Sequence, residues 1–342
     1  MHLLLASLLP LGVFLSALWL TGRFRRYALA RQLLDIPNAR SSHLVPTPRV
    51  GGVAIALTTL MALPLLAAMG ALAWSTAWGL LGGTGLVALI GFADDQSHIA
   101  PPLRLLGHLA AAGWILAWLG GLPPLPLLSF VVDLHWLGYL LGALYLVWVL
   151  NLTNFMDGID GIAAVEAITV CLGGALLYVV TVPGTRQWLA PVVLAAANLG
   201  FLVWNWPPAR IFMGDAGSGF LGLMLAAFSL QAGWLAPTLF WSWLILLGAF
   251  VVDTTVTLFR RVVRGDRFYE AHRSHAYQHA AQRWRAHRPV TLAVGAINVC
   301  WLLPIASLVA VGSLDGVLGL FIAYAPIVAA SLWLRAGKPS LA

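Results

Sequence analysis

Apolar segments about 20 residues long recur along the whole chain, and they limit its fold more than any other feature of the sequence. A helix of this length crosses the hydrocarbon core of a bilayer and satisfies its own backbone hydrogen bonds there. Only 9% of the residues are charged, against about 25% in soluble domains. We therefore expect an all-α, polytopic membrane protein with about eleven spans, at 2–20, 50–69, 71–92, 103–120, 135–153, 162–182, 188–206, 217–234, 238–260, 291–312 and 317–335.

No shift in composition marks a separate soluble domain, so residues 1–342 are expected to form a single integral-membrane domain. The first apolar segment, 2–20, has no basic residue before it and several after it, so we interpret it as a span and not as a signal peptide. Cys171 and Cys300 both fall in apolar segments, which indicates neither a disulfide framework nor a metal site.

Basic residues gather on one side of the expected bundle. All 19 Lys and Arg residues except Arg186 lie in or near the loops of one face, and the positive-inside rule makes that face cytoplasmic. The N-terminus is then outside and the C-terminus inside. The polar chemistry is expected in five cytoplasmic segments: 21–49, 93–102, 151–161, 205–218 and 261–290.

The segment 151–161 lies between two expected spans. Its polar side chains recur at every third position, and they are Asn151, Asn154, Asp157 and Asp160. At this spacing, two or three of them can face one cavity from a helix, and all four can do so if the chain bends at Gly158 and Gly161. Ionisable groups at membrane depth suggest a site for an ion or a charged substrate. The alternative is a polar loop that caps two helices.

Asp94 and Asp95 are adjacent carboxylates at the end of another expected span. Adjacent carboxylates repel each other unless a cation or a shared proton lies between them. One of the pair can orient a metal while the other acts as a base. A solvated helix end is the alternative interpretation.

Three basic side chains in the first cytoplasmic segment, Arg40, His43 and Arg49, are suited to phosphate. The alternative is a basic flank that only sets the topology. The last segment is the most basic, and it contains His272, Arg273 and His275. Some of its charge will attract anionic lipid heads, but this short cluster also offers several donors to a diphosphate.

Asp215 stands next to Gly214 and close to Gly217, where little side-chain bulk blocks a ligand. We expect a helix to begin near residue 217, with its N-terminal amides facing an anion. Phe212, just before, offers a flat surface for a base, or it packs in the core.

Acidic and basic loops that meet at a membrane surface suit Mg²⁺ and phosphate, because Mg²⁺ prefers one or two carboxylates, waters and phosphate oxygens. Zinc-ligand spacings and the ATP-binding phosphate-loop motif are both missing from the sequence. A phosphate-transfer enzyme with a lipid acceptor fits best. A transporter that couples transport to ions is the alternative, although its acids would be expected at the midplane.

Taken together, the loops resemble those of the MraY/WecA-like polyprenyl-phosphate N-acetylhexosamine-1-phosphate transferases, glycosyltransferase family 4. The resemblance covers the cytoplasmic loops from Asp35 to about His279. The motifs that carry it are Asp94-Asp95, Asn154-x-x-Asp157-Gly-x-Asp160-Gly, Phe212-Met-Gly-Asp215-x-Gly-Ser and His272-Arg-Ser-His275. The last of them looks more like the O-antigen-initiating branch than like the peptidoglycan branch, which has three consecutive histidines and a Lys where this chain has Leu44.

The resemblance implies transfer of an N-acetylated amino-sugar 1-phosphate from a UDP-sugar to undecaprenyl phosphate, with release of UMP, for O-antigen or a related surface polysaccharide. It implies Mg²⁺ as the cofactor, with Mn²⁺ as a substitute, on Asp215 and Asp157. The catalytic residues it implies are Asp94, Asp95, Asp157, Asp215, His272 and His275. The substrate-binding residues it implies are Arg40, His43, Arg49, Asn154, Asp160, Asn205, Phe212 and Arg273.

The expected location is the bacterial inner membrane, with the active site facing the cytoplasm. The expected partners are the UDP-sugar, undecaprenyl phosphate and membrane lipids, without nucleic acid, and the family suggests a homodimer. Which UDP-sugar is used, and whether transfer takes one step or passes through a phosphorylated Asp, stay open, with the direct route favoured.

Overall fold

The computed structural model describes residues 2–37, 45–97, 99–128, 130–266 and 272–338, which are mostly helical. In chain order the first eight helices are α1 (His2–Ala30), α2 (Gly52–Ala68), α3 (Trp74–Gln96), α4 (Pro101–Leu119), α5 (His135–Met156), α6 (Ile162–Thr181), α7 (Leu189–Asn205) and α8 (Asp215–Leu235). The remaining helices are α9 (Pro237–Leu246), α10 (Gly248–Val263), α11 (Ala276–Trp284), α12 (Arg288–Ile297), the π-helical turn η1 (Asn298–Leu302), α13 (Leu303–Ala310) and α14 (Gly316–Trp333). Two short antiparallel pairs are β1 (Leu34–Asp35) with β2 (Thr47–Pro48), and β3 (Leu125–Leu127) with β4 (Phe130–Val132).

Within the described residues, seven helices are long and apolar enough to cross a membrane, or eight if the bent pair α9 and α10 forms one span. The seven are α3, α4, α5, α6, α8, the continuous segment Arg288–Ala310 and α14. A multi-span helical membrane protein is thereby confirmed, but eleven spans are not. Helices α2 and α7 are apolar but only 17 residues long, and α1 is outside the set. The orientation of the two ends across the membrane stays a prediction.

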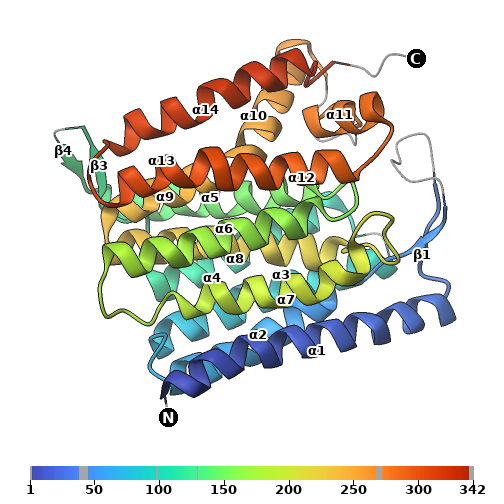
Figure 1. The fold of residues 1–342 in the computed structure, drawn as a ribbon, viewed down its shortest axis with the longest axis horizontal. Coiled ribbons are helices and arrows are strands. Elements are labelled where there is room, and N and C mark those ends of the chain that lie inside the picture. The colour runs from blue at the N-terminus through green and yellow to red at the C-terminus, as the bar shows by residue number, and fades with distance from the viewer. Residues whose placement is uncertain (1, 38–44, 98, 129, 267–271, 339–342) are drawn as a thin grey trace.

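The helices lie side by side along a common direction (Figure 1). Both α1 and α14 begin at the end of the bundle that carries β3 and β4, and both run toward the end that carries β1 and α11 (Figure 1). The C-terminal ends of α3 and α5 and the N-terminal end of α8 lie at this second end. We call it the polar end, because the acidic motifs of the sequence fall there.

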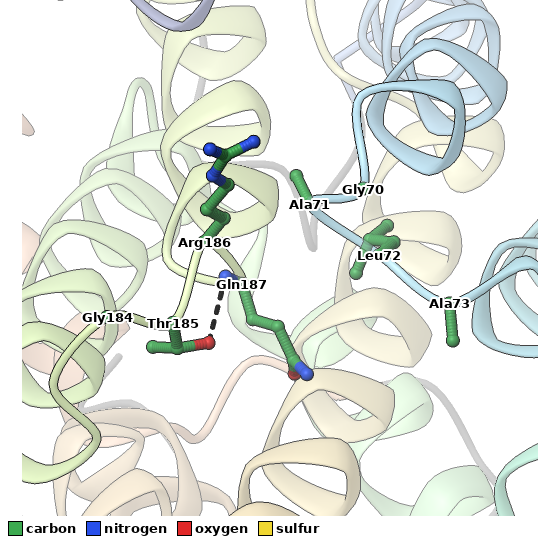
Figure 2. A pocket seen from close by; sticks show the side chains of 8 residues that line it. All are labelled: Gly70, Ala71, Leu72, Ala73, Gly184, Thr185, Arg186 and Gln187. Carbon is green, nitrogen blue, oxygen red and sulfur yellow. Dashed lines mark hydrogen bonds between the residues drawn. The ribbon is translucent and has the colours of Figure 1, made fainter. Parts of the chain in front are cut away.

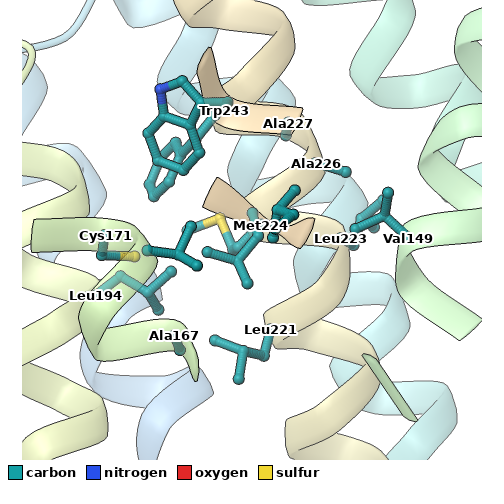
Figure 3. Close-up of a cluster of buried hydrophobic side chains, with 14 of the residues drawn as sticks. Val149, Ala167, Cys171, Leu194, Leu221, Leu223, Met224, Ala226, Ala227 and Trp243 are labelled. Atoms are coloured by element: carbon teal, nitrogen blue, oxygen red, sulfur yellow. The ribbon is translucent and has the colours of Figure 1, made fainter. Parts of the chain in front are cut away.

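Helix α8 forms the centre of the core. Its residues from Ala216 to Gly233 are all buried, as expected for a helix that is apolar on every face. It packs against α3, α5 and α9. Figure 3 shows part of this packing, where Met224 of α8 lies near Cys171 of α6 and Trp243 of α9. A core of this kind fixes the position of the first residue of α8, Asp215, at the polar end.

Several expected boundaries are corrected by the structure. Helix α3 continues to Gln96, so Asp94 and Asp95 belong to its last turn and not to a loop. Helix α8 begins at Asp215, two residues before the expected start. The expected span 238–260 is broken by a 67° bend between α9 and α10.

Candidate functional site

The carboxylate of Asp95 caps the N-terminus of α8. Its two oxygens accept hydrogen bonds from the backbone amides of Asp215, at 3.1 Å, and Ala216, at 3.2 Å. A helix N-terminus carries unpaired amides and partial positive charge, so a carboxylate is well placed there. The sequence predicted an anion at the N-terminal amides of this helix, and the anion that the first two amides bind within the protein is the carboxylate of Asp95.

Two glycines allow α3 and α8 to come this close. A Cβ atom on Gly91 of α3 would lie 2.5 Å from the backbone nitrogen of Ala216. Gly214 has a φ of +75°, and a Cβ there would lie 2.6 Å from Asp95 Oδ2. Side chains at either position would push Asp95 away from the start of α8.

Arg104, in the first turn of α4, joins two carboxylates. Its Nη1 atom bonds Asp94 Oδ2 and lies 3.3 Å from Asp215 Oδ2. The backbone amide of Ile99 donates to the other oxygen of Asp94 at 2.7 Å. The side chain of Asp94 is 6% exposed and that of Asp215 is 39% exposed, so Asp215 is the more open acid of the two.

Asn154 connects the last turn of α5 to the first turn of α8. Its Nδ2 atom lies 2.9 Å from Asp215 Oδ1 and 2.8 Å from Ser218 Oγ. Both contacts orient the open carboxylate from the side opposite Arg104.

Asp157 follows α5 directly and lies close to the same acids. Burial, together with repulsion from Asp215, Asp95 and Asp160, raises the pKa of Asp157 well above its usual value. Negative charge has therefore collected at this point beyond what Arg104 neutralises. A cation bound beside Asp157 would relieve that repulsion.

A cavity of 340 Å³ opens beside these groups, between α3, α4, α5, α8 and α10. The polar residues that line it are Asp94, Arg104, His108, Asn151, Asn154 and Asp215. Apolar side chains continue from this polar part, among them Ile90, Leu105, Trp148 and Leu258. A charged end with an apolar extension fits an amphiphile whose head group is an anion held through a cation.

Residues 48–51, just before α2, are joined to the loop before α8 by backbone hydrogen bonds. The amide of Phe212 donates to Pro48 O at 2.8 Å, and the amide of Gly51 donates to Phe212 O at 2.9 Å. This pairing brings Arg49, a predicted phosphate-binding residue, to the neighbourhood of Asp95, on which its charge acts. Phe212 itself is half-buried. The two other predicted phosphate-binding residues, Arg40 and His43, lie outside the described residues.

Asp160 and Asn205 hold the loop after α5 in place. Asp160 Oδ2 accepts from the amide of Ala209 at 3.0 Å and lies 3.2 Å from His287 Nδ1. Asn205 accepts from the amide of Gly161 at 2.8 Å and donates to Ile211 O at 2.9 Å. Both residues are buried, and the substrate contact that the sequence predicted for them stays a prediction. Their polar atoms bind the protein's own loops.

The histidine segment is organised by Asp253, a buried residue of α10. Its carboxylate accepts from the amides of Ala276 and Tyr277, at 2.8 and 2.9 Å, and so caps α11 as Asp95 caps α8. His275 Nδ1 lies 3.4 Å from the same carboxylate, and the side chain of His275 is 2% exposed. His275 is thus enclosed at the start of α11 instead of facing a cavity.

His272 and Arg273 precede α11. The ring of His272 stacks on that of His275 at 4.9 Å, and Ser274 Oγ lies 3.0 Å from His272 Nδ1. Burial, with repulsion from His275 and Arg261, lowers the pKa of His272 to about 3. The link from this segment to the acids is Tyr277, whose hydroxyl donates to Phe155 O at 3.0 Å.

The structure therefore brings together Asp94, Asn154 and Asp215 in the lining of one cavity. Asp157 lies close enough to Asp215 and Asp95 for their charges to act on it, and Asp95 is buried at the start of α8. Within the described residues, no hydrogen bond or ion pair joins His272, Arg273 or His275 to that group. Sequence reasoning gave no role to Arg104, Ser218 or His287. Arg104 could have been found as the basic residue that begins the helix after Asp94-Asp95, whereas His287 carries no local signal that connects it with Asp160.

A second, smaller set of polar residues lies at the opposite end of the bundle, around a hollow of 470 Å³. Figure 2 shows it between the turn after α2 and the loop before α7, with Arg186 and Gln187 on one side. None of its eight lining residues is acidic, so it lacks the groups that would hold a divalent cation.

No group of three or more His, Cys, Asp or Glu side chains suited to a metal ion occurs in the part of the chain that the structure describes. Mg²⁺ does not require one, because it is held by one or two carboxylates together with waters and phosphate oxygens. Asp215 and Asp157 fit that donor set, since one is partly open and the other carries uncompensated repulsion.

Comparisons with known proteins give a consistent result. Residues 77–233 match the model of glycosyl transferase family 4. The chain is 29% identical over 288 residues to the "Probable undecaprenyl-phosphate N-acetylglucosaminyl 1-phosphate transferase" of Bacillus subtilis, covering 82% of this chain and 78% of the relative. It is 29% identical over 327 residues to the "Decaprenyl-phosphate N-acetylglucosaminephosphotransferase" of Mycobacterium tuberculosis H37Rv, covering 84% and 78%. It is 34% identical over 227 residues to the "Phospho-N-acetylmuramoyl-pentapeptide-transferase" of Moorella thermoacetica, covering 59% and 69%.

Proposed function

The chain belongs to glycosyl transferase family 4, the MraY/WecA-like polyprenyl-phosphate N-acetylhexosamine-1-phosphate transferases, and from this premise we propose which reaction it performs. It transfers an N-acetylated amino-sugar 1-phosphate from a UDP-sugar to undecaprenyl phosphate and releases UMP. The product starts O-antigen or a related surface polysaccharide. The observation that supports this most is the convergence of Asp94 and Asp215 on one cavity with an apolar extension, with Asp157, from a third segment, close to Asp215.

The reaction exchanges one diphosphate bond for another. An oxygen of undecaprenyl phosphate attacks the phosphorus that carries the sugar, and the bond from that phosphorus to the oxygen of UMP breaks. No ATP is needed, because a diphosphate linkage is lost and a diphosphate linkage is formed. The main obstacle is repulsion between the two phosphate groups, so positioning and charge neutralisation supply most of the catalysis. We favour one direct displacement.

The acceptor phosphate is placed at the polar part of the cavity. There Asp94 keeps the acceptor oriented and free of a proton, while Arg104 offsets negative charge between Asp94 and Asp215. The lipid chain follows the apolar wall that includes Leu105 and Trp148. Asp95 acts indirectly, because its carboxylate binds the backbone at the start of α8.

Mg²⁺, or Mn²⁺ in its place, is the proposed cofactor. Asp215 and Asp157 would hold it, and it would supply charge neutralisation for the diphosphate. Asn154 fixes the direction of the Asp215 carboxylate, and this contact prepares the site before any ligand arrives.

The nucleotide is assigned to the side of the site formed by the loop before α8. Phe212 offers the stacking surface for uracil, and Arg49 supports the diphosphate. Arg40, His43 and Arg273 are proposed as further phosphate contacts. Asp160 and Asn205 shape this side by holding its loops. His272 is proposed to approach the diphosphate as a neutral imidazole. His275 is proposed to support the ring of His272 by stacking on it.

The proposed location is the bacterial inner membrane, with the polar end facing the cytoplasm, where UDP-sugars are made. A homodimer is also proposed. The transporter alternative finds no support, because the acids lie in the last turn of α3, directly after α5 and at the start of α8, at one end of the bundle and not at its midplane.

The test uses purified protein in lipid nanodiscs with undecaprenyl phosphate, Mg²⁺ and a panel of UDP-N-acetylated amino sugars. UMP is followed by chromatography and the lipid product by mass spectrometry. One UDP-sugar is expected to give UMP and lipid-linked sugar in equal amounts, and EDTA is expected to stop both. Asp215→Asn should abolish turnover while the protein keeps its elution volume and thermal stability. UMP without lipid product, or full activity of Asp215→Asn, would reject the proposal.

A further inference from the structure

A groove of 970 Å³ lies between α1 and α2, away from the candidate site. Its lining is almost wholly apolar, and the residues on the α1 side are Leu8, Leu9, Gly12, Val13, Ser16, Trp19 and Leu20. The α2 side adds Thr58, Met61, Ala62, Leu65, Ala68 and Met69. Gly12 is one of these lining residues, and a Cβ atom added there would meet nothing within 4 Å, so there is open space beside it.

The groove ends at a positive charge. The guanidinium of Arg23 lies over the ring of Trp19, 5.6 Å from its centroid, and Trp19 is the last aromatic residue of the lining. Arg23 is exposed, and no hydrogen bond or ion pair to it is found within the described part of the chain. Arg26, one turn further along α1, is exposed as well. An anion bound at this end of the groove would neutralise the charge of Arg23.

The length of the groove matches one leaflet. From Leu8 to Leu20 the helix rises about 18 Å, at about 1.5 Å per residue, and one leaflet of the hydrocarbon core is about 15 Å thick. Basic side chains at the ends of spans reach the interface, where lipid phosphates lie. Apolar length and terminal charge therefore fit a single molecule that has both.

We propose that this groove binds an anionic phospholipid, with one acyl chain between α1 and α2 and its phosphate at Arg23. The acceptor lipid is a poorer occupant, because a polyprenyl chain is far longer than the groove and its phosphate would be bound away from the candidate site. A helix of a second copy would match the apolar walls but would not explain the unpaired Arg23. The inference concerns binding alone and does not depend on the proposed reaction.

The first test fills the groove. Gly12→Phe places a ring in the open space, and Gly113→Phe is its matched control, because Gly113 is an exposed glycine of α4 whose Cβ would also meet nothing within 4 Å. Both variants and the wild type are purified in detergent and titrated with phosphatidylglycerol or phosphatidylcholine under native mass spectrometry. The tight phosphatidylglycerol adduct is expected to weaken about tenfold in Gly12→Phe only. Equal adducts in all three proteins would overturn the proposal.

The second test removes the charge. Arg23→Gln is compared with Arg31→Gln, which removes an exposed charge from the turn directly after α1, where the groove has ended. Arg23→Gln should abolish the preference for phosphatidylglycerol over phosphatidylcholine, and Arg31→Gln should preserve it. An unchanged preference in Arg23→Gln would refute the charged contact. Loss of a dimer peak in Gly12→Phe without any change in lipid adducts would show that a second copy fills the groove, and would also reject the proposal.

Discussion

The side chain of Asp95 binds the backbone amide of Asp215 at 3.1 Å, so the two acids are joined through main chain and not through their carboxylates. The carboxylate of Asp215 contacts Arg104 and Asn154 and faces the cavity. Of the adjacent pair, Asp94 faces the cavity and Asp95 faces the core. Substitutions of Asp94 and of Asp95 are therefore expected to have different effects.

Asp95→Asn should lower both stability and activity. The amide can accept only through one oxygen, so one of the two capping bonds is lost, and the loss of a helix cap costs about 1 kcal/mol. The melting temperature in detergent should fall by about 2–4 °C, and UMP release should fall with it. Asp94→Asn should lose activity at an unchanged melting temperature. If both variants melt alike, the division of roles described here is wrong.

Arg104→Gln should reduce UMP release by about 10–100-fold, because it removes the positive charge between Asp94 and Asp215 where phosphate is proposed to bind. Arg104→Lys keeps the charge but not the planar geometry, and it should lose less. Arg186→Gln, at the opposite end of the bundle, is the control and should behave as the wild type. Steady-state assays at several acceptor concentrations would separate a change in KM from one in kcat.

The sequence was sufficient for the helical membrane class and for the nearness of Asp94, Asp157 and Asp215, because apolar length gives the spans and the distribution of basic residues puts these loops on one face. The sequence was not sufficient to predict the role of each acid. That Asp95 points at α8 depends on how closely α3 can approach, which Gly91 and Gly214 decide across more than a hundred residues of chain. The role of Asp253 could not be predicted for the same reason, because the helix that it caps, α11, begins more than twenty residues later.

Glu166 is fully buried in α6, where Asn298 Nδ2 donates to its Oε2 atom at 2.6 Å and to Thr169 Oγ1 at 2.8 Å. A carboxyl group at this depth gains little from a charge, since no cation lies beside it among the described residues. Glu166→Gln should therefore melt within about 2 °C of the wild type. Glu166→Leu leaves one of the two N–H groups of the Asn298 side chain without an acceptor, at a cost of about 1–3 kcal/mol, and should melt several degrees lower. Thermal unfolding followed by tryptophan fluorescence measures both, and a Gln variant as unstable as the Leu variant would contradict this account.

His272 makes the folded protein sensitive to acid. Burial first, and then repulsion from His275 and Arg261, lowers its pKa to about 3, whereas an unfolded histidine has a pKa of about 6.5. Below about pH 6.5 the unfolded chain binds a proton that the folded chain does not, so this contribution to stability is complete above that pH and is lost as the pH falls toward 3. His272→Gln should flatten the decline in melting temperature between about pH 6.5 and about pH 4, by at most a few degrees because the ring is partly exposed. Identical pH profiles for variant and wild type would show that another group titrates.

Gly158 is the point at which α11 touches the loop that carries Asp157. A Cβ atom at this position would lie 2.1 Å from the hydroxyl oxygen of Tyr277. That hydroxyl donates to Phe155 O at 3.0 Å, so it cannot move without losing a partly buried hydrogen bond. Gly158→Ala should therefore displace Asp157 and lower UMP release by about tenfold or more, since a shift of about 1 Å in a catalytic group has such effects. Gly85→Ala, whose Cβ would meet its nearest neighbour at 3.8 Å, is the control.

A second substitution shows whether the clash is the cause. Tyr277→Phe removes the hydroxyl oxygen, and in the double variant with Gly158→Ala the nearest remaining atom of the ring would lie about 3.1 Å from the new Cβ. That distance needs an adjustment of only a few tenths of an ångström, so the double variant should recover part of the activity that Gly158→Ala loses. Tyr277→Phe alone should cost little activity, because it removes one hydrogen bond without displacing the loop. Non-additive kinetics of this sign require the two residues to be in contact, and strictly additive losses would place α11 elsewhere than beside Asp157.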